Sequence, residues 1–153
     1  DLHSARWKTP ESYDIVLSAR RFENWENYVA GKVGLGVAVD YALEIGLEHI
    51  AQRVENLASD LRIRMAGLPG VTVHDLGEKK SGIISFSTCN IEPQKVIEIM
   101  SAKGINISST SALSTRYDMD QRGIKEMNRI GIHYYNSEFE LDQFMGCLRS
   151  LLD

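Results

Sequence analysis

The spacing of apolar residues changes near residues 67–70, and this change is the strongest constraint on the fold. Upstream, two segments, residues 27–46 and 47–68, place apolar side chains three or four positions apart, as in helices. These side chains are Val29, Val33, Val37, Tyr41 and Ile45 in the first segment, and Ile50, Val54, Leu57, Leu61 and Met65 in the second. Gly67, Pro69 and Gly70 end this pattern. Downstream, VTVHDL (71–76) alternates and GIISFST (82–88) is a short apolar run, both typical of strands. The sequence therefore predicts two long helices followed by a sheet.

The remaining segments complete this pattern. EPQKVIEIMSAKG (92–104) predicts a helix with Pro93 near its start, and INISS (105–109) predicts a strand. A further strand, RIGIHYY, begins at Arg129, and a last helix begins near Ser137, where Ser137 and Glu140 have the spacing of a capping box. We expect an α+β fold: a two-layer sandwich with a small, mainly antiparallel sheet, helices on one face, and a preceding pair of long helices.

Composition narrows the class of protein. The chain has 153 residues and a net charge of −4, with acidic and basic residues interspersed, so no basic stripe indicates a nucleic-acid partner. It has no apolar run of the ~20 residues that a membrane helix needs, and a cytoplasmic protein is the default expectation. Cys89 and Cys147 lie far apart without CxxC spacing, which indicates neither a disulfide framework nor a zinc site.

Two segments lack a clear pattern. Residues 1–20 show no periodicity, and we expect an irregular arm or linker from a missing large domain, or alternatively a frayed tail; residues 21–153 then form one small domain. The polar segment from Ser108 to Gly123 is expected to be a long loop, either a lid over a pocket or a flexible surface loop.

Arg129 is the main candidate for a binding residue. It stands at the start of an otherwise apolar strand, where a guanidinium usually holds a carboxylate or a phosphate. A structural salt bridge to Asp118, Asp120 or Glu126 is the alternative. The four histidines lie in four different predicted elements, and no familiar catalytic motif is present, so the residues alone identify no catalytic group.

Four segments in this order resemble one known family: ARRFENWENYVAGKVGLGVAVDYALEIG, LPGVTVHDLG followed by SGIISFST, KGINIS, and NRIGIHYYNSEFELD. They are similar to the C-terminal domain of class V aminotransferase-like proteins. These are fold-type I enzymes that use pyridoxal 5′-phosphate (PLP), and they include cysteine desulfurases, selenocysteine lyases and isopenicillin N epimerase-like proteins. The resemblance implies that Arg129 binds the α-carboxylate of an amino-acid substrate. It also implies that Glu26 and Asn27 lie where related chains approach the cofactor phosphate of a neighbouring subunit.

The sequence departs from the cysteine desulfurases at two places. These enzymes have a small hydroxyl residue and a proline where this chain has Glu26 and Asn27, and they have a nucleophilic cysteine in the loop that corresponds to residues 108–123, which contains none here. The residues of the motifs are more similar to those of the epimerase-like and lyase-like branch. The resemblance therefore predicts a reaction other than persulfide formation, such as transamination, C–S elimination or epimerisation.

The resemblance also implies that most of the cofactor site lies elsewhere. The lysine that binds PLP and most phosphate ligands belong to the family's large domain, so this chain would carry no catalytic residue and would be inactive alone. The intact enzyme is expected to be a homodimer. A stand-alone, non-catalytic module that binds a small ligand or another protein is the alternative.

Overall fold

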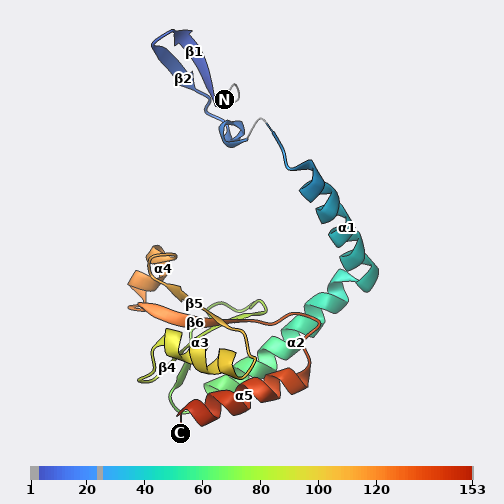
Figure 1. Cartoon of the computed structure of the whole chain (residues 1–153), viewed down its shortest axis with the longest axis vertical. Helices are drawn as coiled ribbons and strands as arrows, with labels where there is room; N and C mark the ends of the chain where they lie inside the picture. The colour runs from blue at the N-terminus through green and yellow to red at the C-terminus, as the bar shows by residue number, and fades with distance from the viewer. Residues whose placement is uncertain (1–3, 24–25, 153) are drawn as a thin grey trace. The chain divides into compact units, whose positions relative to one another are not determined.

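The computed structural model describes residues 4–23 and 26–152. The chain divides into two compact units, Asp1–Ile45 and Gly46–Asp153, which are described separately. Unit 1 begins with a hairpin and ends with a helix, and unit 2 contains a four-stranded sheet with its helices (Figure 1).

Unit 1 is more regular than the sequence predicts. Strands β1 (Ala5–Thr9) and β2 (Ser12–Ile15) pair antiparallel, and a short 3-10 helix, η1, follows at Ala19–Phe22. Trp7 and Tyr13 lie opposite each other with their ring centroids 5.9 Å apart, a cross-strand aromatic pair that stabilises a short hairpin. The predicted irregularity is therefore wrong where β1, β2 and η1 lie, whereas the prediction that residues 1–20 are an arm or linker from a large domain stays a prediction; residues 1–3 lie outside the described residues.

Helix α1 (Val29–Ile45) has apolar side chains on nearly every side and buries none of its residues. Its only charged residues are Lys32, Asp40 and Glu44. The larger apolar side chains, from Val29 to Leu43, keep 48% to 67% of their surface exposed. A helix that is apolar all round is ordinarily a buried helix, so α1 lacks its packing partners within unit 1.

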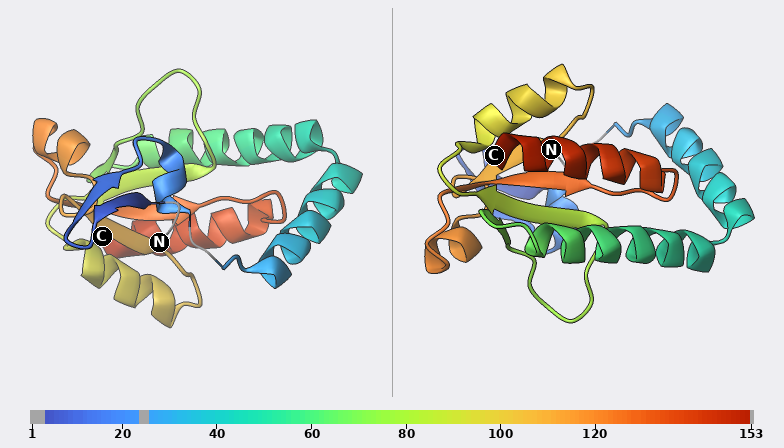
Figure 2. Two further views of the ribbon diagram at one scale, coloured as in Figure 1. Left: turned by 90° about the horizontal axis from the view of Figure 1, so that it is seen from above. Right: turned by 90° about the horizontal axis from the view of Figure 1, so that it is seen from below.

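Unit 2 has the predicted α+β arrangement. Its elements are α2 (Leu47–Ala66), β3 (Val71–Val73), β4 (Ile83–Thr88), α3 (Pro93–Ala102), β5 (Ser108–Ser111), α4 (Arg116–Gln121), β6 (Glu126–Gly131) and α5 (Glu138–Leu152). The strand order is β3-β4-β6-β5, with every neighbouring pair antiparallel. Helices α2, α3 and α5 cover one face of this sheet (Figure 2).

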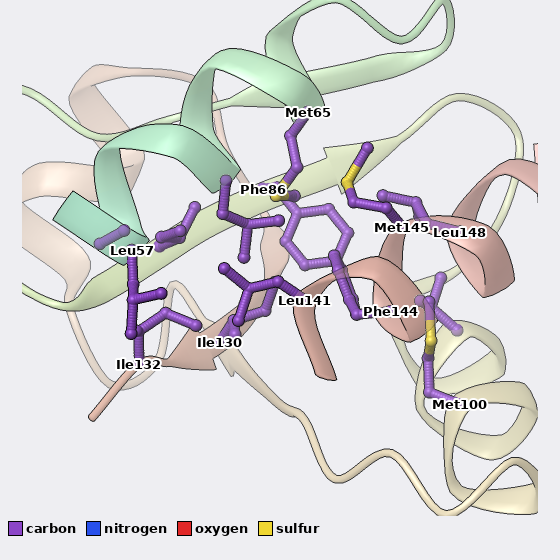
Figure 3. Close-up of a cluster of buried hydrophobic side chains, with 14 residues drawn as sticks. Leu57, Met65, Phe86, Met100, Ile130, Ile132, Leu141, Phe144, Met145 and Leu148 are labelled. Carbon is purple, nitrogen blue, oxygen red and sulfur yellow. The ribbon is translucent and has the colours of Figure 1, made fainter. Parts of the chain in front are cut away.

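The hydrophobic core lies between the sheet and these three helices. It contains fourteen buried residues, and the side chains from α2 and α5 interleave with Phe86 and Ile130 from the central strands (Figure 3). Phe86 meets Phe144 edge to face, with ring centroids 6.2 Å apart. This core fixes which face of each strand is covered, because residues along a strand alternate between the two faces.

Local signals set several element ends as expected. Pro93 begins α3, where its missing N–H costs nothing, and Gly104 follows with φ of +75°, a conformation that favours glycine. The predicted capping box at α5 is confirmed: the Ser137 N–H donates to the Glu140 carboxylate at 2.8 Å, and the Glu140 N–H donates to Ser137 Oγ at 3.3 Å.

Three predictions about the C-terminal half are wrong. The strand predicted at residues 105–109 is displaced, since β5 spans Ser108–Ser111. Residues 108–123 are not one long loop, because β5 and α4 occupy most of them. Arg129 does not open its strand either: β6 begins at Glu126, and Met127 and Asn128 are buried before Arg129 is reached. Strand β6 begins earlier because Glu126, Met127 and Asn128 already pair with residues of β5, and Asn128 also pairs with β4.

Candidate functional site

Strand register places Arg129 in a row of hydroxyl side chains. Arg129 in β6 lies directly opposite Ser85 in β4 and Ser108 in β5. Directly opposed residues of antiparallel strands point to the same face. Because Ile84 and Ile130 alternate with these residues and belong to the core, Arg129 and its two neighbours point to the other face.

We call this other side the second face of the sheet. Alternation along the three strands assigns it eight residues: Ile83, Ser85, Ser87, Ser108, Thr110, Met127, Arg129 and Gly131. None of them belongs to the core cluster. Arg129 is the only charged member, and its guanidinium therefore dominates the electrostatics of this set.

Within the described residues, the side chain of Arg129 has no carboxylate partner and no hydrogen bond, although it is half-buried. Two of the alternative partners are occupied, since Asp118 pairs with Arg122 at 2.9 Å and Asp120 pairs with Arg116 at 2.9 Å. A guanidinium presents five donors in a planar fork. Arg129 is thus available to bind an anion such as a carboxylate.

Asn128, the residue before Arg129, points into the core and is fully buried. Its Nδ2 donates to the backbone oxygen of Pro93, the first residue of α3, at 2.9 Å. Its Oδ1 is the one buried side-chain polar atom in the described residues that no group bonds. Sequence reasoning missed this residue, because an asparagine at a strand end usually indicates a turn.

His74 joins the sheet to the segment that carries α4. The His74 N–H donates to the oxygen of Ser85 at 2.8 Å, and its Nε2 lies 2.9 Å from Ser87 Oγ. Arg122, just after α4, donates to the His74 backbone oxygen at 2.5 Å. Partial burial lowers the pKa of His74, and the positive charge of Arg122 lowers it further, against an opposing effect of Asp75.

A nearly buried ion pair holds the beginning of β4. Arg62 of α2 pairs with Asp75 at 2.7 Å, and their side chains are only 11% and 10% exposed. Arg62 also donates to the oxygens of Ser81 and Ile83, while the Ser85 N–H donates to Asp75. These additional hydrogen bonds offset part of the cost of desolvating the two charges.

Glu26 and Asn27, the predicted phosphate-binding positions, lie just before α1. Both are exposed, and Asn27 Oδ1 accepts a hydrogen bond from Lys32 at 3.0 Å. The carboxylate of Glu26 repels an anion at short range. Asn24, which belongs to the same predicted segment, lies outside the described residues.

The two cysteines and His133, for which the sequence predicts no site role, lie outside the row of Arg129, Ser85 and Ser108. Cys89 is exposed and Cys147 is half-buried in α5, both with free thiols. His133 follows β6 and stacks on Tyr135, with ring centroids 4.4 Å apart. No group of three or more metal-binding side chains occurs among residues 4–23 and 26–152. No helix in these ranges is long and apolar enough to cross a membrane.

Comparison with known proteins identifies a family. The sequence pattern of the family described as Aminotransferase class-V matches residues 7–144. A probable cysteine desulfurase of Halalkalibacterium halodurans is 27% identical over 122 residues, which is 80% of this chain and 30% of that protein. Probable cysteine desulfurase 1 of Mycobacterium leprae is 26% identical, over 87% of this chain and 22% of that protein. The chain thus spans less than a third of the length of these two relatives.

Solved structures show the same fold. The apo cysteine desulfurase of Thermococcus onnurineus superposes with a TM-score of 0.78 and 24% identity, over 98% of this chain and 38% of that one. A complex of a cystine C–S lyase with cysteine persulfide gives a TM-score of 0.67 with 16% identity, over 97% of this chain and 36% of that one. The fold is therefore shared across enzymes with different reactions.

PLP is the cofactor of this family. The second face of the sheet, where Arg129 lies, contains no lysine that could bind it. The described residues of this chain therefore do not by themselves fit the cofactor. What they offer is one unpaired guanidinium on a hydroxyl-lined face.

Proposed function

The chain belongs to the class-V aminotransferase family, and from this premise we propose that it is the part of a PLP-dependent enzyme that binds the α-carboxylate of an amino-acid substrate. Arg129 is the residue that we assign to this task. The observation that carries the proposal is the half-buried guanidinium of Arg129, which has no partner in the described residues. A planar fork binds a carboxylate through two parallel hydrogen bonds and so fixes its orientation.

The position of Arg129 suits this role. It stands in β6, an inner strand of the sheet between β4 and β5, so hydrogen bonds hold its backbone on both sides. A binding group on a rigid strand keeps its geometry better than one on a loop. Its direct neighbours Ser85 and Ser108 have small side chains, each with a hydroxyl that can donate or accept a hydrogen bond.

We propose that the catalytic groups lie in a separate large domain and that residues 21–153 form the small domain of the intact enzyme. PLP would supply the electron sink for the reaction at the substrate carbon, and the strands around Arg129 offer no lysine to hold this cofactor. The chain alone is then inactive. The exposed apolar surface of α1 supports this arrangement, because it would pack against the large domain.

The reaction proposed is transamination, C–S elimination or epimerisation of an amino acid rather than persulfide formation. The relatives reported above are cysteine desulfurases, but residues 108–123 of this chain contain no cysteine. Cys89 and Cys147 lie in other elements and do not replace it. A homodimeric, cytoplasmic intact enzyme is part of the same proposal. Among the described residues, nothing favours the alternative of a stand-alone binding module.

Arg129→Ala in the intact enzyme tests the proposal. We expect kcat/KM for the amino-acid substrate to fall about 100-fold, as for the loss of a bidentate charged pair of about 3 kcal/mol. Arg129→Lys keeps the charge but not the fork, so it should recover only part of this loss. Arg149→Ala, on the exposed side of α5, is the matched control and should leave kcat/KM unchanged. If Arg129→Ala also leaves kcat/KM unchanged, Arg129 is structural and the proposal is wrong.

A further inference from the structure

Asn128 is the only fully buried polar residue among those described in the sheet and its helices. Its side chain lies in the core layer between Phe86 of β4, its opposite neighbour, and the start of α3. It makes one hydrogen bond, to the Pro93 oxygen, and leaves its own Oδ1 without a partner.

This arrangement costs stability. A buried amide oxygen that gives up its hydrogen bonds to water and gains none in the protein is destabilising, whereas an apolar side chain of similar size would not be. The neighbouring core-facing positions of β6 and β4 hold Ile130, Ile84 and Phe86, so an apolar residue would match its surroundings. The hydrophobic core alone therefore does not explain an asparagine here.

The hydrogen bond to Pro93 does something that apolar packing cannot. It is short and directional, and it joins the middle of β6 to the first turn of α3 at one defined point. Apolar contacts tolerate sliding along a strand, while a single buried polar contact can fix register. Arg129 is the next residue, so any shift of Asn128 along or about the strand axis moves the guanidinium.

We propose that Asn128 is a positioning residue: its bond to Pro93 fixes β6 relative to α3 and thereby sets the position from which Arg129 binds its ligand. This inference rests on the function proposed for Arg129. It adds that the chain gives up stability at Asn128 in exchange for the placement of Arg129. Asn128 itself touches no ligand, because it faces the helices while Arg129 faces the second side of the sheet.

Asn128→Leu separates these effects, because it removes the directed bond and the unpartnered oxygen together. For the isolated 153-residue chain we expect an unchanged or higher Tm. For the intact enzyme we expect KM for the amino-acid substrate to rise about tenfold with little change in kcat, since a small misplacement of a binding group weakens binding. If leucine at this site prevents folding, Asn128→Val provides the same test with a smaller side chain that suits a strand.

Ile130→Val is the matched control, because it lies in the same strand, faces the same core and loses one methylene. It should lower Tm and leave KM unchanged. If Asn128→Leu lowers Tm and leaves KM unchanged, or alters neither quantity, Asn128 is an ordinary core residue and the inference is wrong. Measuring Arg129→Ala in the same assay distinguishes the positioning role of Asn128 from the carboxylate-binding role of Arg129. A loss of substrate binding with that variant, but none with Asn128→Leu, rejects the positioning role alone, whereas no loss with Arg129→Ala rejects the proposed function.

Discussion

At the residue scale, the arginines of unit 2 divide by what their guanidinium groups hold. Arg53, Arg62 and Arg122 each combine a carboxylate with at least one backbone oxygen, and each ties a connecting segment to a regular element. Such pairs are structural, since all of their hydrogen bonds stay within the chain. Arg129 and Arg149 have neither kind of partner in the described residues, and of these two only Arg129 is half-buried, whereas Arg149 is exposed to solvent.

His74 is expected to make stability depend on pH. Burial and Arg122 lower its pKa in the folded state below the ordinary 6.5, so the unfolded chain takes up a proton first as the pH falls. The contribution of His74 is therefore complete above about pH 6.5 and is lost as the pH falls through its lower folded pKa. The free energy of unfolding in urea should decrease between about pH 7 and pH 5.

Two variants test whether His74 causes this pH dependence of stability. His74→Gln should remove the decrease attributed to this histidine, because glutamine does not titrate. Arg122→Gln should only reduce it, since burial rather than the Arg122 charge is the larger cause of the lowered pKa. An equal decrease in the wild type and in His74→Gln would assign the pH dependence to other groups.

The sequence predicts a binding role for Arg129 but does not predict the residues that surround it, because their contacts are distant in the sequence. An arginine next to apolar residues is visible as a pattern. By contrast, Asn128 and Asp75 act through partners 35 and 10 residues away, Pro93 and Ser85, which no local pattern connects. The sequence also predicts that the strand starts at Arg129, because Glu126, Met127 and Asn128 alternate out of phase with Ile130: Met127 lies on the second face and Ile130 in the core.

At the scale of elements, strands β4 and β6 form the pair on which the site depends. Their contact continues past the last register pair, because the Ile132 N–H donates to the oxygen of Gly82 at 2.8 Å. A Cβ at Gly82 would lie 2.4 Å from the Ile132 oxygen and 2.7 Å from Val54 Cγ1. Only glycine allows β4 to approach β6 and α2 together at this point.

Gly82→Ala is therefore expected to destabilise unit 2 by about 3 kcal/mol, since a backbone oxygen cannot move away as a side chain can. Urea unfolding of the chain measures this. Gly131→Ala is the matched control: it lies in β6, opposite Ile83, and a Cβ there meets no atom within 4 Å. It should leave stability unchanged or raise it by about 0.5 kcal/mol. Equal losses in both variants would show that the close approach at Gly82 is not the cause.

Helix α4 illustrates which elements the sequence could have revealed. The sequence predicts a polar loop for its six residues, because they form no apolar stripe. The charges do follow helical spacing, with Arg116 four residues before Asp120 and Asp118 four residues before Arg122. The single buried side chain, Met119, was too little to indicate amphipathicity. The long helices and β4, whose patterns span more residues, were predicted correctly.

At the scale of the whole molecule, the two units differ in what stabilises them. Every buried apolar residue of the described chain lies in unit 2, where one core joins three helices to the sheet. Unit 1 has none, although Trp7, Phe22 and the apolar residues of α1 all belong to it. Burial of apolar surface is the main favourable term in folding, so unit 2 has its own source of stability and unit 1 needs a partner.

Residues 46–153 produced alone should therefore fold cooperatively and remain monomeric, whereas the 153-residue chain should self-associate through α1. Sedimentation velocity over a range of concentrations distinguishes the two, and urea unfolding shows whether the shorter chain keeps its core. Val33→Glu combined with Val37→Lys in the whole chain places two charges four residues apart on α1 and should suppress association without altering the unfolding of unit 2. If the whole chain is monomeric, or if residues 46–153 associate more strongly, α1 is not the surface that needs a partner. The proposed packing of this helix against a large domain would then lose its support.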